Sequence, residues 1–381
     1  MLQPLVPVLT IEGNWAVNGP CNLVLKPGGH GVIWKLAKDS GTLDWLQKQN
    51  RSFCLVRQIN NPIAGLDHGL LSLAGYGASR KKAFGFASCP RQKNMSEGMN
   101  ILREVKKECG IECSISNLEY TEFAKRRVSI TDHGAFPANT NILYANLSAI
   151  DEAVDRLAIP GLLVNMKHPV ETVQNGQKKS LLGARLESTM QNIADTITRT
   201  FPEEMSKEKR SHPTFVLLNE RSKTISVTKK AYDGTSTIAE TPEGCFYDLI
   251  KENRRLLKEE CGFTVDEMNT PEEYSKEGPS TLFLYHPALG PLYSVIAQKL
   301  SKGVLAKGSE MQIEAARVAI HNLNLDGSLH IHAKNITGSV NQATKLLDFS
   351  QAVGRCFLEN ITVRNAGIDR AAKNEYWKNV V

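Results

Sequence analysis

The first two hundred residues alternate short apolar runs with helical patterns, and this alternation constrains the fold more than any other feature. Apolar runs bounded by turn residues predict buried strands at 53–59, 84–88, 141–147 and 161–165. Apolar residues at three- and four-residue steps predict helices at 66–74, 149–157 and 186–197. Strands that alternate with helices form an α/β sheet, in which ligands bind outside the carboxyl ends of the strands.

Later segments are more varied. Residues 100–122 fit either a helix or a strand pair that turns at Cys109-Gly110, and both interpretations stay open. We expect a strand at 214–219, a helix at 246–257 and a charged connection containing Pro and Gly at 269–280.

The pattern of apolar and polar residues changes near the C-terminus. Residues 320–336 and 358–367 alternate apolar with polar side chains and are punctuated by Asn and Gly, which suits a small β-helix or a stacked β layer. The chain is therefore expected to comprise a core at 1–235, a helical extension at 236–310 and a C-terminal β-helix-like domain at 311–381.

Composition excludes several classes of protein. The 381 residues carry a net charge of +6, and the basic runs are interleaved with acids, so we expect no nucleic-acid partner. No apolar run approaches the roughly 20 residues of a membrane span, and no signal peptide is evident. The 8 cysteines form no CxxC pair, which is typical of a reducing, cytosol-like compartment, and we assign no metal ligand among them.

The most conspicuous local motif is Lys26-Pro-Gly-Gly-His-Gly31. Its glycines would let backbone N–H groups approach a ligand, and a helix starting near Val32 would point its positive end at an anion. The same motif could be an ordinary turn with a loop histidine. It is not a Walker loop, because the Gly-Lys-Ser/Thr ending is missing.

Four other segments carry groups that could bind a ligand. Arg57-Gln-Ile-Asn-Asn-Pro62 offers amides that could read a base, or it could close a strand in an Asx turn. Glu119, Asn139 and Asn141 could grip sugar hydroxyls, although the two asparagines could equally cap a strand. The segment 221–230 carries four cations and could clamp a diphosphate or be a solvated loop.

Taken in order, these motifs resemble the UDP-sugar pyrophosphorylases, nucleotidyltransferases that form a UDP-sugar from UTP and a sugar 1-phosphate. The resemblance runs from about Ile11 to Trp377 and is strongest to a plastid and bacterial branch that makes UDP-glucose. It rests on the phrases Pro27-Gly-Gly-His-Gly31, Phe136 to Tyr144, Leu186-Glu-Ser-Thr-Met-Gln-Asn-Ile-Ala194, Arg221-Ser-Lys, Val227-Thr-Lys229 and His286-Pro-Ala-Leu-Gly-Pro291.

The resemblance implies a Rossmann-like, GT-A-like mixed sheet and Mg²⁺ as cofactor, with UTP and glucose 1-phosphate or UDP-glucose as ligands. It assigns Gly29 and His30 to the uridine and phosphate end, and Gln58 and Asn60 to the base. It assigns the hexose to Gly98, Glu119, Asn139 and Asn141. It makes Lys229 a catalytic lysine, or Lys230 if the register slips by one.

Two departures from the family pattern bear on activity. The sequence has no Gly-Gly-x-Gly-Thr phosphate loop before Lys26, so we expect an N-terminally incomplete core complemented by a neighbouring polypeptide or a longer start. Asn60 stands where many members carry an aspartate that helps hold Mg²⁺. We expect a uridylyltransferase of the cytoplasm, or of the plastid stroma in a plant or alga; the alternative is a non-catalytic UDP-sugar-binding or scaffold subunit.

Overall fold

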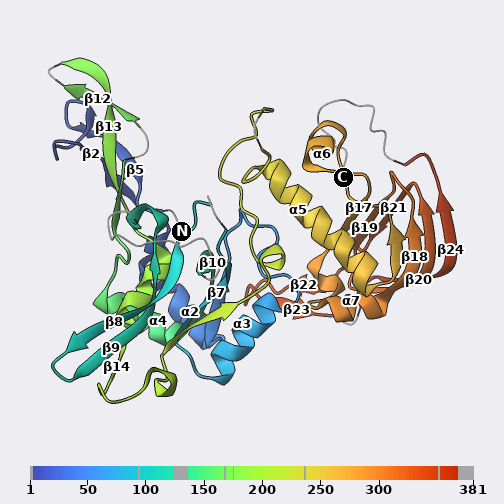
Figure 1. Cartoon of the computed structure of the whole chain (residues 1–381), viewed down its shortest axis with the longest axis horizontal. Helices are drawn as coiled ribbons and strands as arrows, with labels where there is room; N and C mark the ends of the chain where they lie inside the picture. The colour runs from blue at the N-terminus through green and yellow to red at the C-terminus, as the bar shows by residue number, and fades with distance from the viewer. Residues whose placement is uncertain are drawn as a thin grey trace. The chain divides into compact units, whose positions relative to one another are not determined.

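A computed structural model describes residues 3–92, 95–123, 136–166, 169–174, 176–235, 237–350 and 352–367 (Figure 1). The chain separates into two compact units. Unit 1 comprises residues 1–57 and 72–219, and unit 2 comprises residues 58–71 and 220–381. The three-part division expected from sequence stays a prediction.

Unit 1 is built on a mixed sheet in the order β14-β9-β8-β10-β7-β15, with β6 pairing β10. Only β15 and β7 run parallel; the other neighbours are antiparallel. The strands are β6 (Phe53–Val56), β7 (Phe84–Pro90), β8 (Met99–Lys107), β9 (Gly110–Leu118), β10 (Pro137–Asn146), β14 (Arg199–Phe201) and β15 (Thr214–Leu218). The strands predicted at 84–88, 141–147 and 214–219 are confirmed, and the one predicted at 53–59 ends at Val56.

The ambiguous segment 100–122 is a strand pair. Strands β8 and β9 align from Met99 opposite Leu118 to Lys107 opposite Gly110, so the chain reverses at Glu108 and Cys109. The helical interpretation of this segment is therefore wrong.

Helices cover the sheet and complete one apolar core. Helix α4 (Leu147–Arg156) begins where the Asn146 side chain accepts a hydrogen bond from the Ala149 N–H, which is an ordinary N-cap. Its buried face packs with residues of β7 and β10, and the shared core includes Trp34, Phe84, Phe86, Leu143, Ile150 and Ile193. Other helices described here are α1 (Ile33–Asp39), α2 (Thr42–Lys48) and α3 (His68–Ser79), of which α3 belongs to unit 1 from Ser72 on.

The helix predicted at 186–197 is wrong in its first part. Leu186 lies in strand β13 (Gln177–Glu187) and pairs with Val164 of β11 (Leu163–Asn165). A 3-10 helix follows at η3 (Met190–Thr196). Sheet pairing overrides the helical spacing here. Strand β13 also pairs β12 (Pro169–Gln174) and β2 (Leu9–Thr10), while β1 (Leu5–Pro7) pairs β5 (Leu25–Pro27).

Unit 2 contains helix α5 (Pro242–Arg255), as predicted, starting at Thr241, whose side chain accepts the Gly244 N–H. The charged connection predicted at 269–280 instead contains helix α6 (Pro271–Glu277). A capping box between Thr270 and Glu273 starts it, and that Thr-x-x-Glu spacing was readable in the sequence. Helix α7 (Tyr293–Lys299) precedes the C-terminal strands.

The C-terminal part of unit 2 is β-helix-like, as expected from the alternation. Two parallel sheets, β16-β18-β20-β24 and β17-β19-β21, enclose a common apolar core (Figure 1). Leu300, Ile320 and Leu358 occupy one register position on successive strands, which stacks apolar side chains in columns. The strands are β16 (Phe263–Val265), β17 (Leu282–Tyr285), β18 (Leu300–Leu305), β19 (Glu310–Glu314), β20 (Arg317–Asp326), β21 (Ser328–His332) and β24 (Arg355–Arg364).

Among the described residues, no helix combines the length and hydropathy that crossing a bilayer requires.

Candidate functional site

The glycine loop of unit 1 packs directly against the backbone at Ser188. The Gly31 N–H donates to the Ser188 carbonyl at 2.9 Å, and the Ser188 N–H donates to the Gly28 carbonyl at 2.9 Å. Gly29 has φ +89°, and a Cβ there would lie 2.6 Å from the Ser188 nitrogen. Glycine is therefore required by packing, and the Gly31 N–H, which we expected to face a ligand, is used within the protein.

His30 is held by the segment that follows Ser188. The Met190 N–H donates to His30 Nδ1 at 3.1 Å, and Trp34 Nε1 donates to the Met190 carbonyl at 2.8 Å. Because the protein atoms around the ring remove water from it, the pKa of His30 is lowered from its ordinary value. A neutral ring whose Nδ1 accepts a hydrogen bond carries its proton on Nε2, which makes Nε2–H a donor for a phosphate or ribose oxygen.

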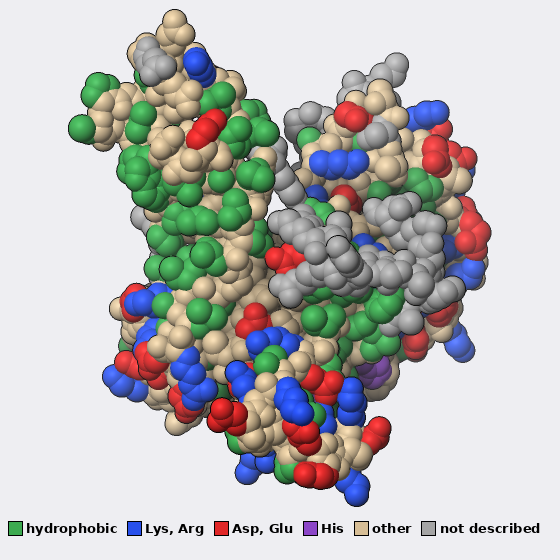
Figure 2. Space-filling view, turned by 60° about the vertical axis from the view of Figure 1, so that its left-hand side comes forward, with side chains coloured by type: hydrophobic (Ala, Val, Ile, Leu, Met, Phe, Trp, Pro, Cys, Tyr) green, Lys and Arg blue, Asp and Glu red, His purple; other side chains and the backbone are tan. Residues whose placement is uncertain are grey.

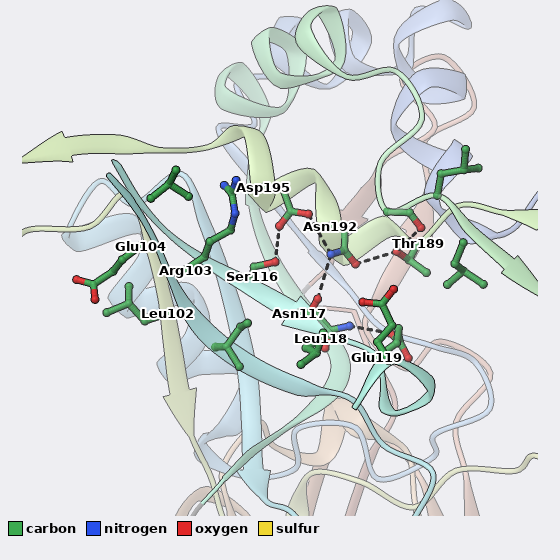
Figure 3. Close-up of a pocket in the computed structure, with 16 residues that line it drawn as sticks. Leu102, Arg103, Glu104, Ser116, Asn117, Leu118, Glu119, Thr189, Asn192 and Asp195 are labelled. Carbon is green, nitrogen blue, oxygen red and sulfur yellow. Dashed lines mark hydrogen bonds between the residues drawn. The ribbon is translucent and has the colours of Figure 1, made fainter. Parts of the chain in front are cut away.

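Glu119 receives two amide donors from different elements. Asn117 Nδ2 donates to its Oε1 at 2.7 Å (Figure 3), and Gln191 Nε2 donates to the same oxygen at 2.9 Å. Gln191 is only 1% exposed and directly follows Met190, so one short segment contacts both His30 and Glu119.

Strand β10 contains a bulge that begins after Asn139 and includes Asn141. The register of β10 against β7 shifts between Asn139 and Ile142, and Asn141 adopts φ 54°. Asn139 Oδ1 accepts the Asn141 N–H at 3.1 Å, and Asn139 Nδ2 donates to Asn141 Oδ1 at 3.0 Å. A bulge of this kind re-aims side chains relative to a regular strand.

Gly98 brings the bulge and Glu119 into one neighbourhood. Its carbonyl accepts the Asn139 N–H at 2.9 Å, and a Cβ at Gly98 would lie 2.8 Å from Asn117 Oδ1. Asn117 is the residue that donates to Glu119. The residues predicted for the hexose, Asn141 included, therefore lie together in unit 1.

A cavity of about 570 Å³ borders Glu119 and is lined by polar groups that the sequence reading did not assign (Figure 3). Asn192 Nδ2 donates to the Asn117 carbonyl and to Asp195 Oδ2, both at 3.1 Å, and Thr189 Oγ1 donates to Asn192 Oδ1 at 2.8 Å. One feature of the sequence could have indicated these polar groups, namely two adjacent amides, Gln191 and Asn192, inside an otherwise apolar segment.

The other predicted residues lie in unit 2. Asn60 Nδ2 donates to the Thr228 carbonyl at 2.9 Å, and the Thr228 N–H donates to the Asn60 carbonyl at 3.0 Å. Gln58 is half-buried two residues earlier, and Lys229 follows Thr228. The structure thus brings the predicted base contacts next to the predicted catalytic lysine, within this unit.

Lys229 and Lys230 differ in their surroundings. Lys229 Nζ lies 2.6 Å from Glu240 Oε1, and the backbone N–H groups of both lysines donate to the Glu240 carbonyl. An ion pair that is partly exposed contributes little to stability but restricts where the ammonium lies.

Asn60 stands where the resemblance places an aspartate that helps hold Mg²⁺, and Asn60 does not suit that ion. Asn60 is uncharged, and its side-chain amide is bound to the Thr228 carbonyl. Mg²⁺ in proteins prefers carboxylate and phosphate oxygens in near-ideal octahedral geometry.

Comparison with known proteins matches the whole chain. UTP–glucose-1-phosphate uridylyltransferase 3, chloroplastic, of Arabidopsis thaliana is 39% identical over 397 residues, covering 100% of this chain and 45% of that protein. The chain is similar to this relative along its whole length. It spans less than half the length of that curated relative. Residues 300–381 also match a family model described as UGP3-like, C-terminal hexapeptide repeats.

Solved structures agree with the fold. A protein of Entamoeba histolytica assigned as a UDP-N-acetylglucosamine pyrophosphorylase aligns with a TM-score of 0.52 at 16% identity, over 71% of this chain and 62% of that one. The UDP-N-acetylglucosamine pyrophosphorylase of Trypanosoma brucei, in complex with an inhibitor, aligns with a TM-score of 0.50 at 17% identity, over 68% and 49%. The α/β core thus shares the fold of these two structures.

Proposed function

We propose that this chain supplies the uridine and sugar sites of a uridylyltransferase that forms UDP-glucose and pyrophosphate from UTP and glucose 1-phosphate. The observation that carries the proposal is the convergence of Gly98, Glu119, Asn139 and Asn141, the four residues that the resemblance assigns to the sugar site. A carboxylate set among amides matches the alternating donors and acceptors of a hexose.

In this reaction a phosphate oxygen of glucose 1-phosphate attacks the α-phosphorus of UTP. The bond from the α-phosphorus to the oxygen bridging to the β-phosphorus breaks, and pyrophosphate leaves with that oxygen. We assign His30 Nε2–H to a uridine or phosphate oxygen and the Lys229 ammonium to the developing phosphate charge. The remaining contribution of the chain is to orient the hexose.

We further propose that additional polypeptide, in the same or another chain, contacts unit 1 and supplies the phosphate loop. An apolar surface on this unit supports the proposal, because large exposed hydrophobic patches mark interaction sites (Figure 2). Its residues come from the elements around β1, β5 and β11, namely Leu5, Ile11, Trp15, Leu25, Leu162 and Val164.

We propose Mg²⁺ only as a companion of the UTP phosphates, since phosphate oxygens suit it better than Asn60 does. We propose a reducing compartment, either the cytoplasm or the plastid stroma; free cysteines support this location, and expression of a fluorescent fusion in plant cells would test it.

Titration calorimetry with UDP-glucose and with UDP tests the sugar assignment. A Glu119→Gln variant loses a charged acceptor, so we expect UDP-glucose to bind roughly 10- to 100-fold more weakly while UDP binding is unchanged. Glu108→Gln is the matched control, because Glu108 lies exposed at the turn of the same hairpin. Weakening of both ligands together would place Glu119 outside the sugar site.

An activity assay distinguishes a catalytic uridylyltransferase from a non-catalytic UDP-sugar-binding or scaffold subunit. Pyrophosphate release from UTP and glucose 1-phosphate would be measured with and without the part of the Arabidopsis relative that this chain does not match. We expect release only in the complemented mixture. Tight UDP-glucose binding without turnover in any mixture would favour a binding or scaffold subunit.

A further inference from the structure

A second group of chemically competent side chains lies in the β-helix-like part of unit 2. Glu314, His330 and His332 each offer a nitrogen or carboxylate oxygen, and these atoms all lie within 4.8 Å of one another. None of the three was assigned a role from the sequence or belongs to the candidate site of unit 1.

The strand register explains why they meet. Strands β19 and β21 are parallel, and Glu314 pairs with His332 while Gln312 pairs with His330. Alternate residues of a strand share a face, so the two histidines flanking buried Ile331 point to the same side. The carboxylate comes from the neighbouring strand at the same level.

The distances suit a bridging cation. His332 Nδ1 lies 2.8 Å from Glu314 Oε2, His330 Nε2 lies 3.8 Å from Glu314 Oε1, and the two imidazole centroids are 5.8 Å apart. Their side chains are 58%, 33% and 44% exposed for His332, Glu314 and His330, so an ion can reach them from solvent.

Neighbouring groups form a supporting shell. Gln312 Nε2 donates to Glu314 Oε1 at 3.2 Å, whereas Gln312 Oε1 is buried without a hydrogen-bond partner among the described residues. A cavity of about 370 Å³ is lined by Gln312, Glu314 and His286. His286 Nδ1 already accepts the Ala288 N–H, so we place His286 in the wall and not among the ligands.

We propose that Glu314, His330 and His332 bind a divalent transition-metal ion of the Zn²⁺ class through two imidazole nitrogens and one carboxylate oxygen. Imidazole and carboxylate together suit Zn²⁺ and Co²⁺, and two histidines with one glutamate is a known zinc ligand set. The cavity leaves a coordination position for water or a small ligand. Gln312 orients Glu314, as an outer-shell partner of a metal ligand does.

Equilibrium dialysis of the tag-free protein against Zn²⁺ tests the site without any substrate. We expect about one ion per chain, and at least a tenfold loss of affinity in His332→Ala and in Glu314→Gln. His321→Ala is the matched control: His321 lies on β20, contacts Ser301 Oγ, and should leave binding unchanged.

Two further measurements distinguish the loss of a metal ligand from misfolding of the variant. Zn²⁺ should raise the Tm of the wild-type protein and of His321→Ala but not that of His330→Ala, because only a folded site is stabilised by its ligand. Co²⁺ should give visible d–d absorption that His330→Ala abolishes. Substoichiometric binding, or equal binding by folded wild-type and His332→Ala proteins, would overturn the proposal and leave a surface ion pair.

Discussion

The Met190 N–H donates a hydrogen bond to His30 Nδ1 at 3.1 Å. This bond joins the glycine loop to the segment whose next residue, Gln191, donates to Glu119. The uridine and sugar ends assigned by resemblance are therefore connected through two consecutive residues. A substitution of His30 should consequently affect both the uridine end and the sugar end of the site.

The contribution of His30 to the stability of the protein should depend on pH. Burial lowers the folded-state pKa, so the neutral ring stabilises the fold above the unfolded pKa of about 6.5, and that contribution is lost as pH falls toward the folded value. His30→Asn keeps an acceptor but cannot titrate. Thermal melts from pH 8 to pH 5 should fall more steeply for wild type than for the variant, while His212 titrates in both. Parallel profiles would contradict this assignment.

Gly29 should tolerate no side chain. Its φ of +89° strains a residue with a Cβ, and such a Cβ would also lie 2.6 Å from the Ser188 nitrogen, which is a steric overlap. Gly13 has a similar φ of +85° but nothing within 4 Å of a Cβ, so Gly13→Ala measures the strain alone. We expect Gly13→Ala to lower the free energy of unfolding by about 1 kcal/mol and Gly29→Ala by roughly 2 kcal/mol more, by urea denaturation. Equal losses would mean that Ser188 moves aside.

The bulge residue Asn141 can be tested without strain. Asn141→Gly suits the φ of 54° and removes only the side chain, so the protein should keep its Tm within a few degrees. If the amide contacts the hexose, UDP-glucose affinity falls roughly tenfold while UDP affinity is unchanged. Asn360→Gly, at φ 52° in unit 2, controls for the backbone effect. Unchanged UDP-glucose affinity would remove Asn141 from the sugar site.

Much of the fold was readable from local pattern. Apolar runs located β7, β10 and β15, and alternation located β20, β21 and β24, because these signals depend on burial of each segment by itself. The prediction of a helix at 186–197 was wrong at its start because Leu186 pairs with Val164 across a sheet. Such a pairing between distant residues cannot be read from a local window of sequence.

The site was accessible from sequence only in part. Residue chemistry singled out Glu119 and Asn139, and the resemblance added Gly98, but neither revealed the bulge, since it depends on the register between β10 and β7. Gln191 was missed because its segment was treated as a core helix.

Lys229 and Lys230 can be separated by turnover in the complemented assay described above. Lys229 Nζ is positioned by Glu240 at 2.6 Å, so Lys229→Ala should lower kcat about 100-fold or more, with little change in UDP-glucose affinity. Lys230→Ala is the matched control and should retain activity, because Glu240 positions the ammonium of Lys229 and no described residue positions that of Lys230. Glu240→Gln keeps the side-chain shape and should cost less than loss of the lysine. A large loss of kcat in Lys230→Ala alone would show that Lys230, and not Lys229, is the catalytic lysine. Full activity in both variants would show that this segment takes no part in the reaction.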